Sequence, residues 1–278
     1  MGEPFGQGSY AVRLDWGPVG AVRCGADVTA VVDVLSFSTA VDVAVERGTR
    51  VYPCRFVGDH ARAVATNHGA AVAVGRLEAI KDGAVVAPSL SPATLLEIPA
   101  VERLVLPSPN GSTIVMEAIG AGSTVVAGCL RNARAVAARL ARALDAGQSI
   151  GVIAAGERWD FDRSLRPALE DHVGAGAILA HLEAMGYGDA FSPEARAASA
   201  LFRASAESLE RLLHECVGGR ELSEMGFAAD VTVAAALDTS ATVPVIVDGA
   251  FVDDHGPLSP PGTPTRHDAP ADDVPARS

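Results

Sequence analysis

The fold class follows from two neighbouring stretches, Ile153-Ala-Ala-Gly-Glu-Arg-Trp159 and Arg166-Pro-Ala-Leu-Glu-Asp-His-Val-Gly-Ala-Gly176. An apolar run ends at Gly156, and two opposite charges, Glu157 and Arg158, follow it directly. A second acidic pair then opens a helix rich in Gly and Ala. This order is typical of α/β proteins, whose ligands bind beyond the carboxyl ends of the strands. Carboxylates at such an edge hold a hard metal ion, and arginine holds a phosphate or sulfonate.

The same alternation of strand and helix extends over most of the chain. Runs rich in β-branched residues predict strands, and Ala/Leu/Arg-rich stretches, several of them ended by glycine, predict helices. The predicted strands are 28–34, 51–52, 71–74, 104–106, 124–127 and 150–155, and the predicted helices are 38–47, 59–68, 111–119, 132–144 and 170–185. We therefore expect an α/β protein of three α/β/α layers with a mostly parallel or mixed sheet, which two similar α/β halves could form.

The last hundred residues follow a different pattern. Helices are expected at 194–215, 222–226 and 229–237, and a hairpin at 243–252 around the turn Asp248-Gly249. We interpret residues 1–252 as one α/β catalytic region, with a subdivision near Gly147 as an alternative. Residues 253–278 are rich in Pro and Asp and poor in apolar residues, which predicts a disordered tail.

The composition argues against several classes of partner. The chain has 278 residues and a net charge of −12, which excludes nucleic acid as the main partner. The apolar runs are shorter than the roughly 18–20 residues that a membrane span needs. The four cysteines form no CxxC pair and no zinc-ligand spacing, which predicts reduced, buried thiols. Because no signal peptide is visible, we expect a soluble, cytoplasmic protein.

Asp33 is the first candidate for a catalytic residue. It lies in the apolar run Ala30-Val-Val-Asp-Val-Leu35, where a buried carboxylate needs a partner or a metal ion. We interpret Asp33 as a metal ligand or general base. The alternative is a cap of the following turn through Ser36 or Ser38. A haloacid-dehalogenase phosphatase is excluded, because that superfamily requires a second Asp where this chain has Leu35.

Two loops between a predicted strand and a predicted helix are candidates for anion binding. They are Pro107-Ser-Pro-Asn-Gly-Ser112 and Gly128-Cys-Leu-Arg-Asn-Ala133. Helix N-termini, hydroxyls and an arginine can together hold an anion. The alternatives are a turn with a helix cap for the first loop and a surface arginine beside a cap for the second. The predicted substrate-binding residues are Ser108, Asn110, Gly111, Ser112, Arg131 and Asn132.

The acidic residues Glu157, Glu170 and Asp171, together with Asp33, could supply the oxygen ligands that Mg²⁺ prefers. Glu170 and Asp171 are about 100° apart on a helix, so only one of them is expected to face the site. Zinc is excluded because the histidines of this helix lack HExxH spacing. Arg158 is predicted to be catalytic together with Asp33 and Glu157.

Three other features carry weaker predictions. Gly174 and Gly176 lie inside a predicted helix, where close packing against a strand or a ligand loop would explain them. The segment Gly174–Ala180 could equally pack against a second copy of the chain, so a homo-oligomer is a further possibility. Asp230 and Asp238 are interpreted as solvated helix ends, with domain closure or a second acidic contact as the alternative.

These motifs, in this order, resemble the 2-phosphosulfolactate phosphatase family, the ComB-like proteins. The matching segments are Val32-Asp-Val-Leu35, Pro107-Ser-Pro-Asn-Gly-Ser112, Gly128-Cys-Leu-Arg-Asn132, Ala155-Gly-Glu157, Leu169-Glu-Asp171, Gly174-Ala-Gly-Ala-Ile178 and Val243-Pro-Val245. The resemblance implies an α/β fold and a Mg²⁺-dependent acid phosphatase that removes phosphate from 2-phosphosulfolactate, a step toward coenzyme M.

The chain departs from the family's pattern at two places. Ser36 stands where the family usually has arginine, and Val85-Val-Ala-Pro-Ser-Leu-Ser-Pro92 keeps only the Ser-Pro end of the family's segment. We therefore predict a Mg²⁺-dependent phosphatase for a small anionic phosphorylated metabolite, with no nucleic-acid or membrane partner. The alternatives are a phosphatase for a different metabolite, such as a phosphosugar, and a non-catalytic anion-binding or regulatory protein.

Overall fold

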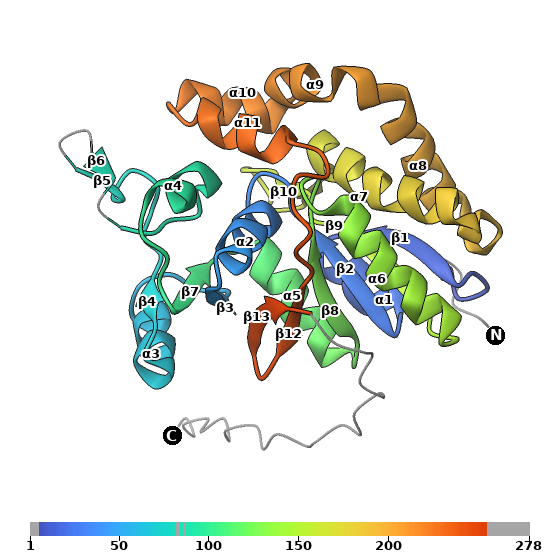
Figure 1. Cartoon of the computed structure of the whole chain (residues 1–278), viewed down its shortest axis with the longest axis horizontal. Coiled ribbons are helices and arrows are strands. Elements are labelled where there is room, and N and C mark those ends of the chain that lie inside the picture. Colours follow the sequence, from blue (N-terminus) through green and yellow to red (C-terminus); the bar gives the residue numbers. More distant parts are fainter. Residues whose placement is uncertain (1–5, 82–83, 86, 255–278) are drawn as a thin grey trace, which may run out of the picture.

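The computed structural model describes residues 6–81, 84–85 and 87–254, and its centre is a nine-stranded mixed sheet (Figure 1). The strands are β1 (Val12–Trp16), β2 (Val28–Val32), β3 (Arg50–Cys54), β4 (Ala71–Val72), β7 (Arg103–Pro107), β8 (Thr124–Gly128), β9 (Ile150–Ala154), β12 (Pro244–Val247) and β13 (Ala250–Asp253). Their order across the sheet is β1-β9-β2-β8-β12-β13-β3-β7-β4. The predicted α/β class with a mixed sheet is confirmed.

The sheet consists of two parallel groups joined by an antiparallel hairpin. β1, β9, β2 and β8 pair in parallel, as do β3, β7 and β4. The hairpin β12–β13 connects the groups through one register pair on each side, Val245 with Val126 and Phe251 with Val51. Strands from before and after Gly147 lie in the same group, since β2 pairs with β9 along its whole length.

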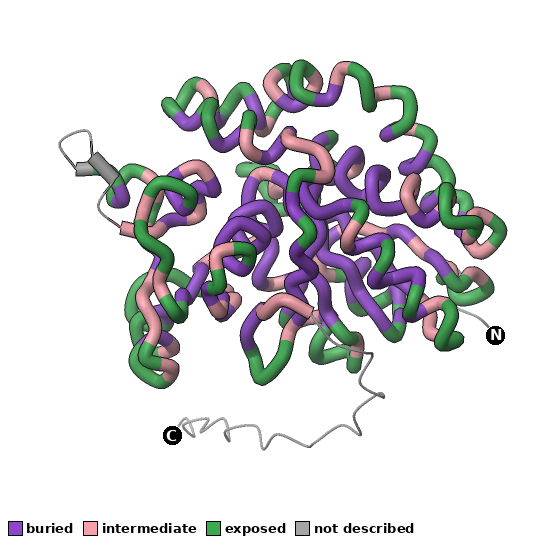
Figure 2. The backbone as a smooth tube through the Cα atoms, viewed as in Figure 1, coloured by how far each residue is buried: buried purple, intermediate pink, exposed green. Residues whose placement is uncertain are grey.

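Helices cover both faces of the sheet. They are α1 (Gly17–Cys24), α2 (Phe37–Glu46), α3 (Asp59–His68), α4 (Pro92–Glu97), α5 (Gly111–Gly120), α6 (Ala133–Asp145), α7 (Leu169–Leu182), α8 (Pro193–Ser205), α9 (Leu209–Glu215), α10 (Val217–Glu224) and α11 (Ala228–Ala235). Successive side chains of β2 point to opposite faces of the sheet, so the strand contributes to two buried apolar clusters. Ala30 and Val32 pack with α6, α7 and α8, whereas Val31 packs with α2 and α5. Figure 2 shows these buried strands and helix faces in purple.

The structure differs from the sequence prediction in several elements. β1 and α1 were not expected, because Arg13 and Asp15 interrupt the apolar pattern of this edge strand. α4 was not expected either, although Ser91 caps it by accepting the N–H of Thr94 (3.1 Å). The single helix expected at 194–215 is divided into α8 and α9 by a short 3₁₀ turn, Ala206–Ser208.

The chain ends of the prediction also need revision. The predicted tail begins two residues too early, because Asp253 belongs to β13 and the N–H of Asp254 donates to the backbone oxygen of Val243 (3.0 Å). The rest of the predicted tail, from residue 255 onward, lies outside the described residues. Among the helices that the structure describes, none is long and apolar enough to cross a membrane. All four cysteines are free and buried, as predicted.

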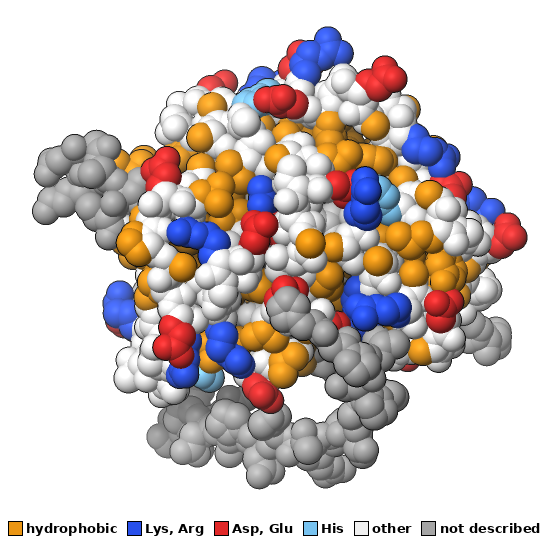
Figure 3. Space-filling view, viewed as in Figure 1, with side chains coloured by type: hydrophobic (Ala, Val, Ile, Leu, Met, Phe, Trp, Pro, Cys, Tyr) orange, Lys and Arg blue, Asp and Glu red, His pale blue; other side chains and the backbone are white. Residues whose placement is uncertain are grey.

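The two glycines of α7 have the packing role that the sequence suggested. A Cβ at Gly174 would lie 2.5 Å from the side chain of Val34, and one at Gly176 would lie 2.2 Å from the backbone oxygen of Ala198. Only glycine permits this close approach of α7 to β2 and α8. On the face shown in Figure 3, arginines are scattered among acidic side chains and are not gathered into one basic patch.

Candidate active site

The candidate site lies where β2 and β9 end. The two strands pair in register up to Val32 and Ala154, and the N–H of Ala155 donates to the oxygen of Val32 (2.8 Å). Asp33 directly follows β2. The predicted strand 28–34 had included Asp33, so that strand ends two residues earlier than expected. After β9 the chain forms a small hairpin, β10 (Glu157–Arg158) with β11 (Leu165–Arg166), and then enters α7. The predicted acidic residues therefore come from adjacent strand ends and from the first turn of α7.

Asp33 contacts the start of α2 through its side chain and its backbone. One carboxylate oxygen accepts the N–H of Phe37 at the start of α2 (3.1 Å), and the N–H of Asp33 donates to the hydroxyl of Ser38 (3.1 Å). The capping alternative is thus present. Its second oxygen accepts no hydrogen bond from any described residue, and only 8% of Asp33 is exposed. One carboxylate oxygen is consequently available to a ligand.

Burial and neighbouring charges explain the titration of Asp33. Burial raises its pKa to about 7, and the negative charge of Glu157 adds to this shift. The N–H of Phe37 opposes the increase. Glu170 raises the pKa further, and the guanidinium of Arg76 lowers it. Negative charge at this point of the fold is therefore incompletely compensated.

Asp171 forms hydrogen bonds with the backbone that follows β2 and with the backbone that follows β9. Its two carboxylate oxygens accept the backbone N–H groups of Val34 (2.7 Å) and Gly156 (2.8 Å). Burial raises its pKa well above the usual range, and the charges of Asp33 and Glu170 contribute. Its position in the first turn of α7 partly offsets this cost, because a helix N-terminus favours negative charge.

Glu157 and Glu170 complete the carboxylate cluster, which we define as Asp33, Glu157, Glu170 and Asp171. Glu157 accepts a hydrogen bond from the side-chain amide of Asn110 (2.8 Å). Burial raises the pKa of Glu157, whereas Asn110 and the charge of Arg166 lower it. Glu170 is 5% exposed and lies against the start of α10, where a Cβ at Gly218 would be 2.4 Å from its carboxylate.

The loop between β7 and α5 brings one of its predicted residues to the cluster. Asn110 contacts Glu157, as described above. Ser108 accepts the N–H of Gly111 (3.2 Å), and Ser112 accepts the N–H of Cys54 (3.1 Å), so both hydroxyls stabilise the loop. Gly111 is required sterically, because a Cβ there would lie 2.3 Å from the ring of Phe37. The predicted turn describes Ser108, whereas Ser112 connects the start of α5 to Cys54 and to the backbone oxygen of Leu106.

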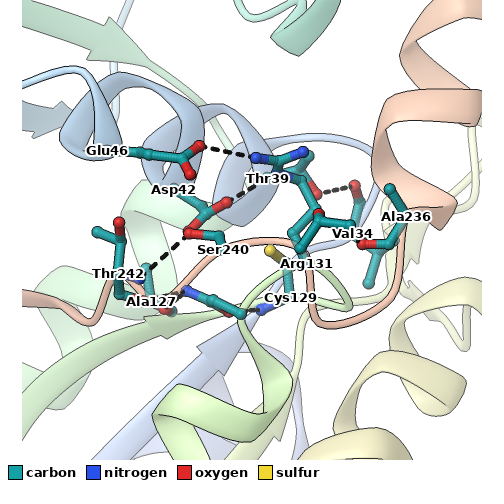
Figure 4. Close-up of polar contacts among 12 residues, drawn as sticks. Val34, Thr39, Asp42, Glu46, Ala127, Cys129, Arg131, Ala236, Ser240 and Thr242 are labelled. Carbon is teal, nitrogen blue, oxygen red and sulfur yellow. Dashed lines mark hydrogen bonds and ion pairs between the residues drawn. The ribbon is translucent and has the colours of Figure 1, made fainter.

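Arg131 and Asn132 belong to a separate buried network, shown in Figure 4. Arg131 forms ion pairs with Asp42 and Glu46 of α2, each at 2.8 Å, and is 8% exposed. Asn132 accepts the N–H of Cys129 (2.9 Å) and donates to two backbone oxygens. This geometry does not support the predicted substrate contacts, and Arg131 is not the surface arginine of the alternative either.

Arg158 lies on the hairpin beside a cavity. Its guanidinium donates to the backbone oxygen of Arg163 (3.2 Å). The cavity has a volume of about 290 Å³ and is lined by Trp16, Asn110, Glu157 and Leu165, among others. Arg158 thus borders open space next to Glu157, which is compatible with the predicted contact to substrate.

Arg76 is the functional candidate that the sequence reasoning missed. It donates to the hydroxyl of Ser36 (2.6 Å) and to the carboxylate of Asp230 (3.1 Å). The prediction that Asp230 is a solvated helix end is wrong, because it is 1% exposed; the alternative of a second acidic contact describes it better. The signal available in the sequence was Ser36 itself, whose short side chain leaves room for a cation from another segment.

The donor set fits a metal ion that takes few protein ligands. Within residues 6–81, 84–85 and 87–254, no group of three or more His, Cys, Asp or Glu side chains is arranged to hold a metal ion. Mg²⁺ needs no such cage, since it is usually bound by one or two carboxylates, waters and substrate phosphate. The free oxygen of Asp33 beside Glu157 meets that requirement, whereas both oxygens of Asp171 are engaged by backbone N–H groups.

Comparison with known proteins identifies the family of the chain. Residues 22–249 match the sequence model of a family described as 2-phosphosulpholactate phosphatase. Fold, site and match define an α/β enzyme of the phosphoric monoester hydrolase class. A probable 2-phosphosulfolactate phosphatase of Pseudothermotoga lettingae is 26% identical over 227 residues, 81% of this chain and 92% of that protein. The chain belongs to the 2-phosphosulfolactate phosphatase family, and the resemblance inferred from its motifs is confirmed.

A second relative matches over a shorter region. A probable 2-phosphosulfolactate phosphatase of Gloeobacter violaceus is 33% identical over 145 residues, which are 52% of this chain. The matched region spans 56% of that protein, little more than half of its length.

Proposed function

We propose that this protein is a Mg²⁺-dependent phosphatase for a small anionic phosphomonoester, with 2-phosphosulfolactate as the first candidate substrate. The observation that carries the proposal is the buried carboxylate cluster at the ends of β2 and β9, where Asp33 keeps one oxygen free and has a raised pKa. Family membership supports the reaction class. We place the reaction in the cytoplasm, as the sequence suggested.

In this proposal Asp33 and Glu157 would hold the metal ion, and Glu170 adds negative charge beside them. When bound, Mg²⁺ would polarise the phosphoryl group and lower the pKa of an attacking water. Asn110 fixes the orientation of Glu157 by its hydrogen bond of 2.8 Å. Asp171 acts as a positioning residue, because it holds the backbone on either side of the cluster.

The charge of the transferred phosphoryl group needs positive partners besides the metal. Arg158 borders the cavity next to Glu157 and can reach the phosphoryl oxygens from the hairpin. Arginine donors aimed at the developing charge stabilise the transition state of phosphoryl transfer.

The test is phosphate release from 2-phosphosulfolactate and from a panel of other small phosphomonoesters, with Mg²⁺ and with EDTA. We expect Mg²⁺-dependent release in the native protein and its loss in the Asp33→Asn and Glu157→Gln variants. Glu102→Gln is the matched control, since this carboxylate is 81% exposed at the start of β7. Full, EDTA-insensitive activity in both site variants would overturn the proposal.

The panel also separates the alternatives that the sequence left open. Release from another ester alone keeps the mechanism and changes the substrate. If a folded sample binds phosphate or sulfonate but releases phosphate from no ester, the protein is an anion-binding member of the family. Calorimetry with and without chelator measures that binding directly.

A further inference from the structure

The guanidinium of Arg76 is held in place on three sides. Its Nε donates to Asp230 (3.1 Å), and its Nη2 donates to Ser36 (2.6 Å) and to the backbone oxygen of Leu90 (3.4 Å). These partners come from α11, from the start of α2 and from the segment before α4. Such an arrangement fixes both the position and the plane of the guanidinium.

Asp230 is itself fixed by other groups. Its second oxygen accepts the hydroxyl of Ser91 (2.5 Å) and the N–H of Ala93 (3.1 Å) at the start of α4. The carboxylate is 1% exposed, whereas the side chain of Arg76 is 17% exposed. A side chain supported by a second layer of hydrogen bonds is preorganised for a ligand.

Arg76 retains donors for such a ligand. A guanidinium has five N–H donors, and the contacts above use three of them. The two N–H groups of Nη1 donate to no residue in the described part of the chain. Arg76 also lines a cavity of about 550 Å³, together with Val57, Gly58, Leu90 and Pro107.

Arg76 connects this cavity with the carboxylate cluster. Pro107 in its wall directly precedes the loop that carries Asn110 to Glu157. Ser36, which binds Arg76, is three residues beyond Asp33, and the charge of Arg76 acts on Asp33. A small molecule with its phosphoryl group at Asp33 can therefore extend toward Arg76.

We propose that Arg76 binds the second acidic group, a sulfonate or carboxylate, of a phosphomonoester whose phosphoryl group lies at Asp33 and Glu157. The inference rests on the proposed function and names the residue that would contact the acidic group of its substrate. The two free N–H groups of Nη1 can donate to the oxygens of a sulfonate or a carboxylate. Arg76 is thus a specificity-determining residue.

The experiment is calorimetric titration in the presence of Mg²⁺ with 3-sulfolactate, lactate, isethionate and inorganic phosphate. We compare the native protein with Arg76→Lys and with the control Arg103→Gln, whose guanidinium lies at the start of β7 and is 42% exposed. Arg76→Lys should weaken 3-sulfolactate binding about 10- to 100-fold, because the charged hydrogen bonds from Nη1 are lost. Phosphate affinity should change less than threefold. Lactate and isethionate report whether carboxylate or sulfonate is the group bound.

A purely structural role of Arg76 predicts a different result. In that case the variant would lose affinity for phosphate and for 3-sulfolactate together, or it would keep both affinities. Either outcome overturns the proposal. If Arg76→Lys fails to fold, Ser36→Ala provides the test, since it removes only one hydrogen bond to the guanidinium. Ser36→Ala should lower the affinity for 3-sulfolactate a few-fold and leave the affinity for phosphate unchanged. If the variant and the native protein bind 3-sulfolactate with equal affinity, the proposal is overturned.

The outcome is distinguishable from failure of the proposed function. Absence of phosphate release from every ester of the panel would refute the phosphatase proposal. Arg76-dependent binding of 3-sulfolactate in the same sample would still support the assignment of Arg76.

Discussion

Two buried polar networks meet the same helix, α2, and they differ in how their charges are balanced. At one network Asp42 contacts Arg131 (2.8 Å) and the hydroxyl of Ser240 (2.8 Å). At the other, the described hydrogen-bond donor to the carboxylate of Asp33 is the N–H of Phe37. The first network holds its own counter-charge, while the second accumulates carboxylates. The comparison teaches that similar burial gives a balanced ion pair at Asp42 and an excess of negative charge at Asp33.

The titration of the two acids follows the same difference. Burial raises the pKa of Asp42 to about 6, with Ser240 and Arg131 opposing the increase. Burial raises the pKa of Asp33 to about 7, and its carboxylate neighbours add to the shift. A bound cation would reduce the repulsion between Asp33 and its carboxylate neighbours. At Asp42 the guanidinium of Arg131 already supplies this positive charge.

The largest expected effect is on activity at the carboxylate cluster. Asp33→Asn should lower kcat/KM for the preferred ester by about 10³-fold, because it removes a metal ligand and a charged acceptor. The amide oxygen can still accept the N–H of Phe37, so the unfolding free energy should hold or rise. Phosphate-release kinetics and urea unfolding measure the two quantities. Lost stability with retained activity would contradict the functional assignment of this network.

The reverse result is expected at the other network. Arg131→Met should lower the unfolding free energy by about 3–5 kcal/mol, because it leaves Asp42 buried without its ion pair. The folded fraction should keep kcat/KM within tenfold of the native value. Urea unfolding followed by circular dichroism gives the stability. An unchanged midpoint, or a selective loss of substrate affinity, would show that Arg131 serves the site after all.

The smallest effect is the pH dependence of Mg²⁺ binding. Below its pKa of about 7 Asp33 is mainly protonated, and the proton competes with the cation. Affinity should therefore rise with pH and level off above neutrality, by up to about tenfold per pH unit below the pKa. Calorimetric titration with Mg²⁺ at pH 6 and pH 8 measures this. Asp33→Asn should weaken binding at both values and flatten the difference; equal affinities in the native protein would exclude Asp33 as a ligand.

The sequence allowed prediction of those features that depend on local pattern. The apolar runs predicted β2 and β9, and polar residues after them located Asp33 and Glu157 at the site. It could not reveal that Arg76 meets Ser36 and Asp230, because these contacts join positions 40 and 154 residues apart in the chain. Such pairs follow from tertiary packing, which periodicity does not encode.

The error at Arg131 has the same origin. A glycine-bounded loop with an arginine before a helix has the appearance of an anion site. Arg131 forms ion pairs with two acidic residues, Asp42 and Glu46. They lie on another helix, about ninety residues away in the chain. In the sequence the one-turn spacing of these two acids on α2 was the only sign of a partner.

The fastening of two strand ends by Asp171 has a mechanical consequence. One side chain of α7 sets the spacing between the backbone at Val34 and the backbone at Gly156. Behind this helix, Gly176 packs directly on α8. Direct contacts therefore run from α8 through α7 to the backbone on both sides of the site.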